Sequence, residues 1–297
     1  MMSTPIEMIT AEKEFPQADS AALEAAGFYW REREGTRALI CSPLEADGFT
    51  NAFSTRLGGV SPMPENALNL AGFNEDEAEN IYENLRRFLN LFPGEWLLTG
   101  CWQVHGVDIR VVHSPNDAQQ KPGVPGDDQY CDALISNTPK ILLAVKTADC
   151  VPVLIGDRST RAFAAVHAGW RGTSSSIVER AVEKLAGEFG ARPENVRAAI
   201  GPAAKACCYE VGAEVLSVFK ERFPDSDKLF TPTREGHARI DLHQANRDQL
   251  IASGVSPDRI HIAPLCTMDR NDLFFSYRKE KQKHGRVGRL MSVIGTR

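Results

Sequence analysis

Three residues with metal-binding or catalytic side chains follow one another within a short stretch: Cys150, His167 and Arg171. A thiolate can attack a carbonyl carbon or bind a soft metal, and an imidazole can act as a base or as a ligand. A guanidinium binds phosphate through two parallel hydrogen bonds. Whether these groups cooperate depends on the elements that carry them.

Two short apolar runs, residues 151–155 and 162–166, flank a Gly-, Asp- and Ser-containing stretch that favours a tight turn between antiparallel strands. If Ile155 pairs with Ala162, the same register places Cys150 opposite His167. Opposed Cβ atoms lie about 4.5–5.5 Å apart, so the pattern predicts a Cys–His pair at the open end of a hairpin. The ordinary alternative is that each is a buried core residue, and a slip of one residue would separate them.

Arg171 precedes a predicted helix. Residues 176–179 read Ser-Ile-Val-Glu, a capping-box pattern, and apolar residues recur at helical spacing through residue 189. Free amides and the helix dipole at such an end attract anions. We therefore expect Arg171, Gly172 and Thr173 to bind phosphate, with Arg56 as a second candidate because it precedes a glycine pair that can form an anion-binding turn.

Composition limits the class of protein. The chain has 297 residues, of which 42% are apolar and 25% charged, with a net charge of -5. This balance favours a globular protein and disfavours nucleic-acid binding. No apolar run reaches membrane-spanning length and no leader pattern is present, so we expect a cytoplasmic protein without membrane contact. Seven irregularly spaced cysteines favour reduced thiols or metal ligands over disulfides.

The rest of the chain predicts one α/β domain with a mixed sheet, because neither a long linker nor an internal repeat divides it. His105 lies at a strand junction beside Gly106. Residues 114–130 and 266–289 are predicted to be polar loops. Further strands and helices are predicted at residues 38–41, 49–56, 107–111, 131–136, 196–200, 239–241, 259–263 and 290–294 (strands) and at residues 21–26, 81–92, 178–189, 215–219 and 242–253 (helices).

Several ordered motifs resemble the YfiH-type family, once labelled multicopper polyphenol oxidoreductase or laccase-domain. They are Gln-Val-His-Gly at 103–106, Thr-Ala-Asp-Cys at 147–150, His-Ala-Gly-Trp-Arg-Gly at 167–172, Cys-Tyr-Glu-Val at 208–211 and Ser-Tyr-Arg at 276–278. The resemblance implies a mixed-sheet sandwich flanked by helices, similar to deamidating toxins and related cysteine hydrolases. It also implies a single catalytic domain over residues 48–297, with residues 1–47 as an extension packed on it.

The resemblance further implies zinc held by His105, Cys150 and His167, with copper as a less favoured ion. Such a donor set leaves a fourth position open, as in catalytic zinc sites, and an open zinc lowers the pKa of bound water to about 7. The implied reactions are phosphorolysis of adenosine, inosine and S-methyl-5'-thioadenosine and hydrolytic deamination of adenosine. Purine nucleosides and phosphate would then be the small-molecule partners.

The acid–base group of such a reaction stays open between Asp149, Asp132, Glu210 and Tyr209, which all lie beside candidate active-site loops. Asp149 is the first choice, and orienting a ligand histidine is an equally good role for it. Tyr209, like Trp170, can also stack on a purine.

Three rival functions remain at this stage. Cys150 and His167 can form a metal-free cysteine hydrolase, acting for example in cell-wall precursor editing. A polyphenol oxidase, the older family label, is disfavoured because the seven histidines include no His-x-His pair. A metal-binding partner protein without turnover is the third.

Overall fold

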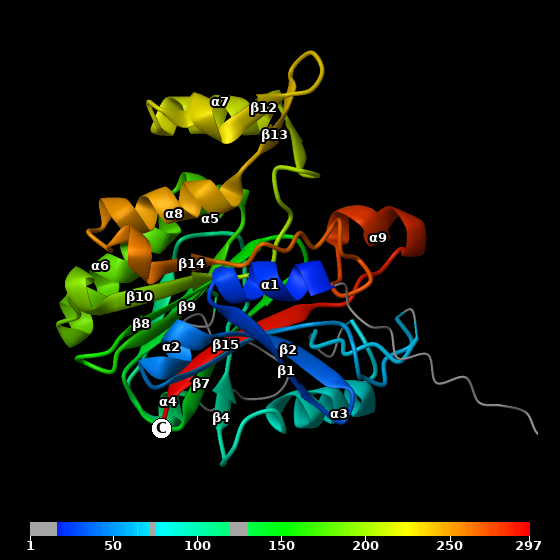
Figure 1. Ribbon diagram of the computed structural model, residues 1–297, viewed down its shortest axis with the longest axis vertical. Coiled ribbons are helices and arrows are strands. Elements are labelled where there is room, and N and C mark those ends of the chain that lie inside the picture. The colour runs from blue at the N-terminus through cyan, green and yellow to red at the C-terminus, as the bar shows by residue number, and fades with distance from the viewer. Residues whose placement is uncertain (1–16, 64, 72–74, 119–129) are drawn as a thin grey trace, which may run out of the picture.

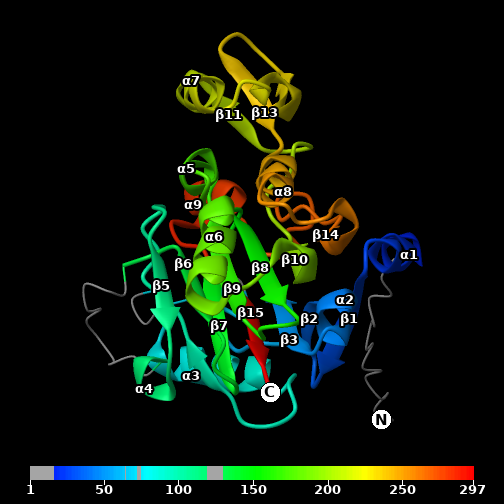
Figure 2. The same cartoon turned by 90° about the vertical axis from the view of Figure 1, so that its left-hand side faces the viewer.

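The computed structural model describes residues 17–63, 65–71, 75–118 and 130–297. Two six-stranded mixed sheets stack face to face, and helices cover the outer faces (Figures 1 and 2). The mixed-sheet sandwich expected from the sequence is therefore confirmed. No helix within the described ranges combines the length and the apolar character needed to cross a membrane.

The first sheet combines the two ends of the chain with its middle. In spatial order its strands are β1 (Phe28–Arg33), β2 (Thr36–Cys41), β3 (Phe49–Ser54), β15 (Leu290–Thr296), β7 (Ile141–Thr147) and β4 (Leu97–Thr99). Helices α1 (Gln17–Ala25), α2 (Ser42–Ala46) and α3 (Ala78–Leu89) accompany it, and Phe88 of α3 packs on its outer face. The N-terminal strands β1 and β2 are thus continuous with this sheet through β3.

The second sheet carries the predicted hairpin. Its order is β14 (Ile260–Ile262), β10 (Val196–Ile200), β8 (Val151–Asp157), β9 (Phe163–Ala168), β6 (Ala133–Ser136) and β5 (Ile109–Val112). Helices α5 (Trp170–Ser174), α6 (Ile177–Phe189) and α8 (Leu242–Ala252) lie on its outer side, and α4 (Pro115–Ala118) follows β5. Short 3-10 turns occur at Pro193–Asn195, Ser226–Leu229 and Pro257–Arg259.

A small third sheet stands apart at the top of Figures 1 and 2, beyond α5 and α8. It contains β11 (Glu210–Gly212), β13 (His237–Ile240) and β12 (Phe230–Pro232), and α7 (Ala213–Arg222) packs beside it. The last helix, α9 (Tyr277–His284), precedes β15.

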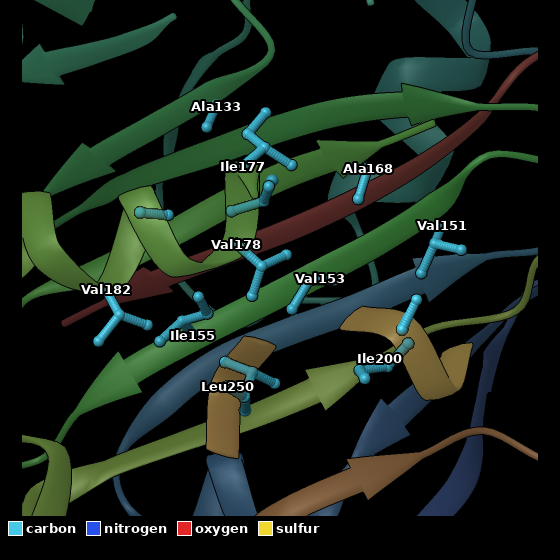
Figure 3. Close-up of a cluster of buried hydrophobic side chains, with 14 of the residues drawn as sticks. Ala133, Val151, Val153, Ile155, Ala168, Ile177, Val178, Val182, Ile200 and Leu250 are labelled. Atoms are coloured by element: carbon cyan, nitrogen blue, oxygen red, sulfur yellow. The ribbon is translucent and has the colours of Figure 1, made fainter. Parts of the chain in front are cut away.

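Strand alternation decides which face each side chain takes. Ala168 of β9 lies with Val151, Val153 and the α6 side chains in one apolar layer (Figure 3), which also includes Val166. Phe163 and Ala165 belong to the layer between the two sheets. Successive residues of a strand point to opposite faces. His167 therefore shares the inter-sheet side of β9 with Phe163 and Ala165.

Three local predictions were wrong. The predicted capping box is absent, because Ser176 takes a left-handed conformation (φ 59°) and its side chain makes no capping hydrogen bond. The polar segment after residue 266 is not all loop: residues 277–284 form α9. This helix is held by Ser276, whose Oγ accepts from the Lys279 amide, and by Glu280, whose carboxylate accepts from the Ser276 amide. Within the predicted 114–130 loop, residues 115–118 form α4, and residues 119–129 lie outside the described part of the chain.

Candidate active site

The hairpin is present, but its register differs from the predicted one by two residues. Ile155 pairs with Ala164, so His167 faces Pro152 and not Cys150 across the ladder. A shift of two keeps every side chain on its predicted face. Cys150 lies just before β8 and reaches the same end of the hairpin. A Cβ added to Gly169, the residue after β9, would lie 3.1 Å from the Cys150 Sγ, so this glycine leaves the thiol its space.

His105 completes a three-donor group with Cys150 and His167. Its backbone is left-handed (φ 62°), and its Nε2 lies 3.9 Å from the Cys150 Sγ. The two imidazole rings meet edge to face, with centroids 4.9 Å apart. One donor atom from each of the three residues lies within 4.8 Å of the others. The structure thus brings together the three residues that the family resemblance implied as metal ligands.

Asp132 holds this group in place. Its Oδ1 lies 2.7 Å from the His167 Nδ1, and the carboxylate also accepts from the amides of Val104, His105 and Gly106 at 3.2, 3.0 and 2.6 Å. One buried carboxylate therefore fixes the orientation of one imidazole and the backbone that carries the other. From the sequence, Asp149 was a candidate both for acid–base chemistry and for orienting a ligand histidine, whereas in the structure Asp132 has the orienting geometry.

The charges in the group favour a thiolate. Burial alone would raise the pKa of Cys150, but the charge of His167 and the hydrogen bonds from His105 and His167 lower it to about 6. Burial likewise opposes protonation of His167, yet the Cys150 charge and the Asp132 hydrogen bond raise its pKa to about 9. Without a metal, a thiolate and an imidazolium therefore coexist near neutral pH.

The donor set fits a zinc ion. Tetrahedral zinc with Zn–S near 2.3 Å and Zn–N near 2.0 Å needs S···N separations of roughly 3.5 Å, close to the 3.9 Å between Cys150 Sγ and His105 Nε2. His167 bonds Asp132 through Nδ1, which leaves its Nε2 for a metal. A metal-ligating histidine commonly donates its other ring N–H to a carboxylate. Two nitrogens, one sulfur and an outer carboxylate match a catalytic zinc site.

Asp149 joins the Cys150 loop to the C-terminal segment. Its Oδ1 accepts from the Thr267 hydroxyl (2.7 Å), and its Oδ2 accepts from the Ser276 hydroxyl (3.0 Å) and the Arg278 amide (2.8 Å). Burial raises the pKa of Asp149, against the effect of these hydrogen bonds. Its backbone is left-handed (φ 87°). These contacts fix the backbone immediately before Cys150.

Tyr209 lies near the thiol, with an arginine over its ring. Burial, reinforced by the Cys150 charge, raises the pKa of Tyr209 to about 12. The Arg278 guanidinium carbon lies 5.0 Å from the ring centroid, and its Nη1 donates to the Glu210 carbonyl at 2.9 Å. Arg278 was not among the site residues predicted from the sequence. Its signal was Ser276 followed by Glu280, which begin the helix that carries it.

The predicted phosphate-binding residues occupy different surroundings. Arg171 is exposed in the short helix α5, 4.1 Å over the Trp170 ring and 3.4 Å from Glu214. Gly172 and Thr173 are buried, the Thr173 amide donates to the Gly169 carbonyl, and the Thr173 hydroxyl contacts Asn246. Of these three residues, Arg171 alone presents an exposed charge.

Arg56 is buried and bonded inside the protein. Its guanidinium forms an ion pair with Glu280 (3.0 Å), donates to the carbonyls of Asn271 (2.9 Å) and Met63 (3.2 Å), and lies 4.5 Å from the Phe275 ring centroid. These contacts tie the turn after β3 to the segment around α9. They use both terminal nitrogens of the guanidinium.

Comparison with known proteins places this chain in a family. Residues 50–297 match the family model described as multi-copper polyphenol oxidoreductase laccase. A Bacteroides thetaiotaomicron protein named purine nucleoside phosphorylase is 35% identical over 79% of this chain and 87% of its own. The Escherichia coli purine nucleoside phosphorylase YfiH is 34% identical over 83% and 93%.

Solved structures agree. YlmD from Geobacillus stearothermophilus superimposes with a TM-score of 0.80 at 31% identity, over 91% of this chain and 99% of that one. A Bacillus licheniformis protein named YfiH also gives a TM-score of 0.80, at 28% identity. The chain therefore belongs to the multi-copper polyphenol oxidoreductase laccase family, together with the YfiH and YlmD proteins.

Proposed function

We propose that this chain is a zinc-dependent purine nucleoside phosphorylase that also deaminates adenosine to inosine more slowly. The observation that carries the proposal is the convergence of His105, Cys150 and His167 around one point, with Asp132 behind them. Relatives named purine nucleoside phosphorylase, similar over most of the chain, supply the substrate class. A zinc ion held by the three donors would supply Lewis acidity.

The roles of the surrounding residues follow from their contacts. Asp132 holds the Nδ1 proton of His167 and so directs Nε2 toward Cys150. Asp149 acts by positioning: its three hydrogen bonds hold the loop that enters Cys150. The Tyr209 ring, half-buried and near the thiol, offers a face for a purine.

Phosphate needs cationic groups beside the three donors. In phosphorolysis a phosphate oxygen bonds to the anomeric carbon of ribose, the bond to the purine breaks, and the base takes up a proton. Arg171 lies in α5, just after β9, the strand that carries His167. Its ion pair with Glu214 is exposed and 3.4 Å long, so the guanidinium remains available for phosphate. Arg278, next to Tyr209, is another exposed cation. Arg56 supports the fold in this proposal, since its nitrogens already have partners.

Product analysis tests the proposal. Purified enzyme is incubated with adenosine with and without phosphate, beside Cys150→Ala and His167→Ala, and an Asp108→Asn variant serves as the matched surface control. Phosphate should shift the product from inosine to adenine and ribose 1-phosphate, and both site variants should lose each route. If deamination survives the loss of Cys150, phosphorolysis and deamination do not share one site.

A second candidate function is a metal-free cysteine hydrolase. One observation favours it: the Cys150 thiolate interacts with the His167 imidazolium, which in turn contacts the Asp132 carboxylate that orients it. Metal content separates the two functions. If protein that contains no zinc cleaves an amide and does not turn over nucleosides, the assignment changes from phosphorylase to cysteine hydrolase.

A further inference from the structure

A second group of cysteines lies outside the site described above. Cys207 and Cys208 occupy the turn between β10 and β11, and Cys266 lies in the segment after β14. The three sulfur atoms lie within 4.8 Å of one another, with 3.5 Å between Cys207 and Cys208. A bridge between Ala203 and Cys266, with the Thr267 amide donating to the Ala203 carbonyl, holds the two segments side by side.

The surroundings of these sulfurs suit a soft cation. Three thiolates around one zinc, with Zn–S near 2.3 Å, require S···S distances of about 3.8 Å, so little movement is needed. The Cys266 Sγ already accepts from the Lys205 amide at 3.4 Å. The buried thioether residue Met268 belongs to the same apolar cluster as Cys266 and Cys208.

Protons on these thiols would compete with a metal ion. Burial, followed by contacts with Cys208 and Cys266, raises the pKa of Cys207 to about 12, and burial raises the pKa of Cys208 as well. A metal ion that bound there would displace protons and join the two segments.

We propose that Cys207, Cys208 and Cys266 form a second metal site, which binds one thiophilic ion of the zinc or copper(I) class independently of the His105–Cys150–His167 group. Hard oxygen-seeking ions such as magnesium are excluded by the all-sulfur donor set. Thr267, next to Cys266, donates to Asp149, next to Cys150. The second ion would therefore brace the loop that carries the thiol of the first site.

Cadmium titration of reduced, chelator-treated protein tests the site, because cadmium–thiolate bonds absorb in the near ultraviolet. The parent is Cys150→Ser, which removes the thiol of the first group. It should bind one equivalent of Cd²⁺ with a thiolate absorption band. Adding Cys207→Ser, an exposed position whose change spares the core, should weaken binding at least about tenfold, since losing even an outer partner of a ligand costs about 10–100-fold.

Adding Cys101→Ser to the same parent is the matched control. Cys101 contacts Cys131, so this change also removes one member of a close thiol pair, but outside the proposed site. This variant should keep the band and its affinity. Loss of the band on removing Cys101 but not Cys207 would overturn the proposal. So would a disulfide between Cys266 and Cys207 or Cys208 in protein purified without reductant, detected by peptide mass spectrometry, since it would make the group a redox pair.

Discussion

Asp132 lies directly opposite His167 where the β6–β9 ladder ends: the His167 amide donates to the Asp132 carbonyl at 2.8 Å, and the side chains meet at 2.7 Å. The pairing Ala133–Val166, continued by one residue, produces this opposition. A backbone ladder therefore sets the position of the carboxylate that orients the imidazole.

Replacing Asp132 by Asn should weaken zinc binding about 10- to 100-fold, the usual cost of losing the outer partner of a metal-ligating histidine. The amide side chain presents one acceptor where the carboxylate serves His167 and three backbone amides. Competition against a chelator of known affinity measures the loss. Asp108→Asn changes an exposed side chain whose backbone carbonyl accepts from the Asp132 amide. It should bind zinc as wild type does, and equal affinity in both variants would contradict the role of Asp132.

The thiol of metal-free protein should react with iodoacetamide in a pH-dependent way, with a midpoint near 6, because the His167 charge outweighs burial and lowers the pKa of Cys150 to about 6. An ordinary thiol titrates near 8.5. The same depressed pKa stabilises the fold above the usual thiol pKa, and this contribution is lost as the pH falls through 6. Peptide mass spectrometry of Cys150 gives the rate. Asp132→Asn should raise the midpoint, because it destabilises the imidazolium.

Much of this arrangement follows from sequence patterns of short range. The hairpin was predictable because two apolar runs flank a turn. Its register was not, since several turn lengths fit residues 156–161. The structure uses a turn in which the Asp157 carboxylate accepts from the amides of Ser159 and Thr160, and this shifts the pairing by two.

Short-range patterns could not predict which strands pair when they are far apart in the sequence. The opposition of Asp132 and His167 depends on β6 lying next to β9, and no local feature of either strand specifies its neighbour. Helix α9 was missed because its residues Tyr277–His284 are mostly charged, without an apolar periodicity. Its caps were visible in the sequence, with Ser276 at the start and Gly285 at the end.

Gly169→Ala should reduce metal content and activity while the fold persists. The added methyl would lie 3.1 Å from the Cys150 Sγ and 3.2 Å from the His105 ring, and the φ of -67° at this position suits alanine. The conflict is therefore steric and local to the donors. Zinc analysis with circular dichroism measures both effects.

Gly187→Ala is the matched control for this change. Nothing lies within 4 Å of a Cβ built at Gly187, which is in helix α6. Alanine there should stabilise the protein by up to about 1 kcal/mol and leave zinc unchanged. Full zinc occupancy in Gly169→Ala would show that the donors have more room than the structure gives them.

Arg56→Met should destabilise the protein by about 3 to 5 kcal/mol, the usual cost of leaving one partner of a buried ion pair alone. The change removes the pair with Glu280 and the hydrogen bonds to two carbonyls. Urea unfolding measures the free energy. Arg37→Met, whose ion pair with Glu32 is more exposed, should cost far less, and equal losses would argue against the buried network.

Arg171→Lys should raise the phosphate concentration needed for half-maximal phosphorolysis, with zinc content and unfolding free energy unchanged. Lysine keeps the positive charge but loses the planar fork that binds two phosphate oxygens at once. The ion pair that Arg171 makes with Glu214 is 57% and 72% exposed on its two sides, so its loss has little effect on stability. Initial rates at varied phosphate and saturating inosine give the constant. Glu214→Gln, which removes the competing carboxylate, should shift it the opposite way. If neither substitution changes the phosphate dependence while Arg278→Lys does, then phosphate binds beside Tyr209 and Arg171 has no part in holding it.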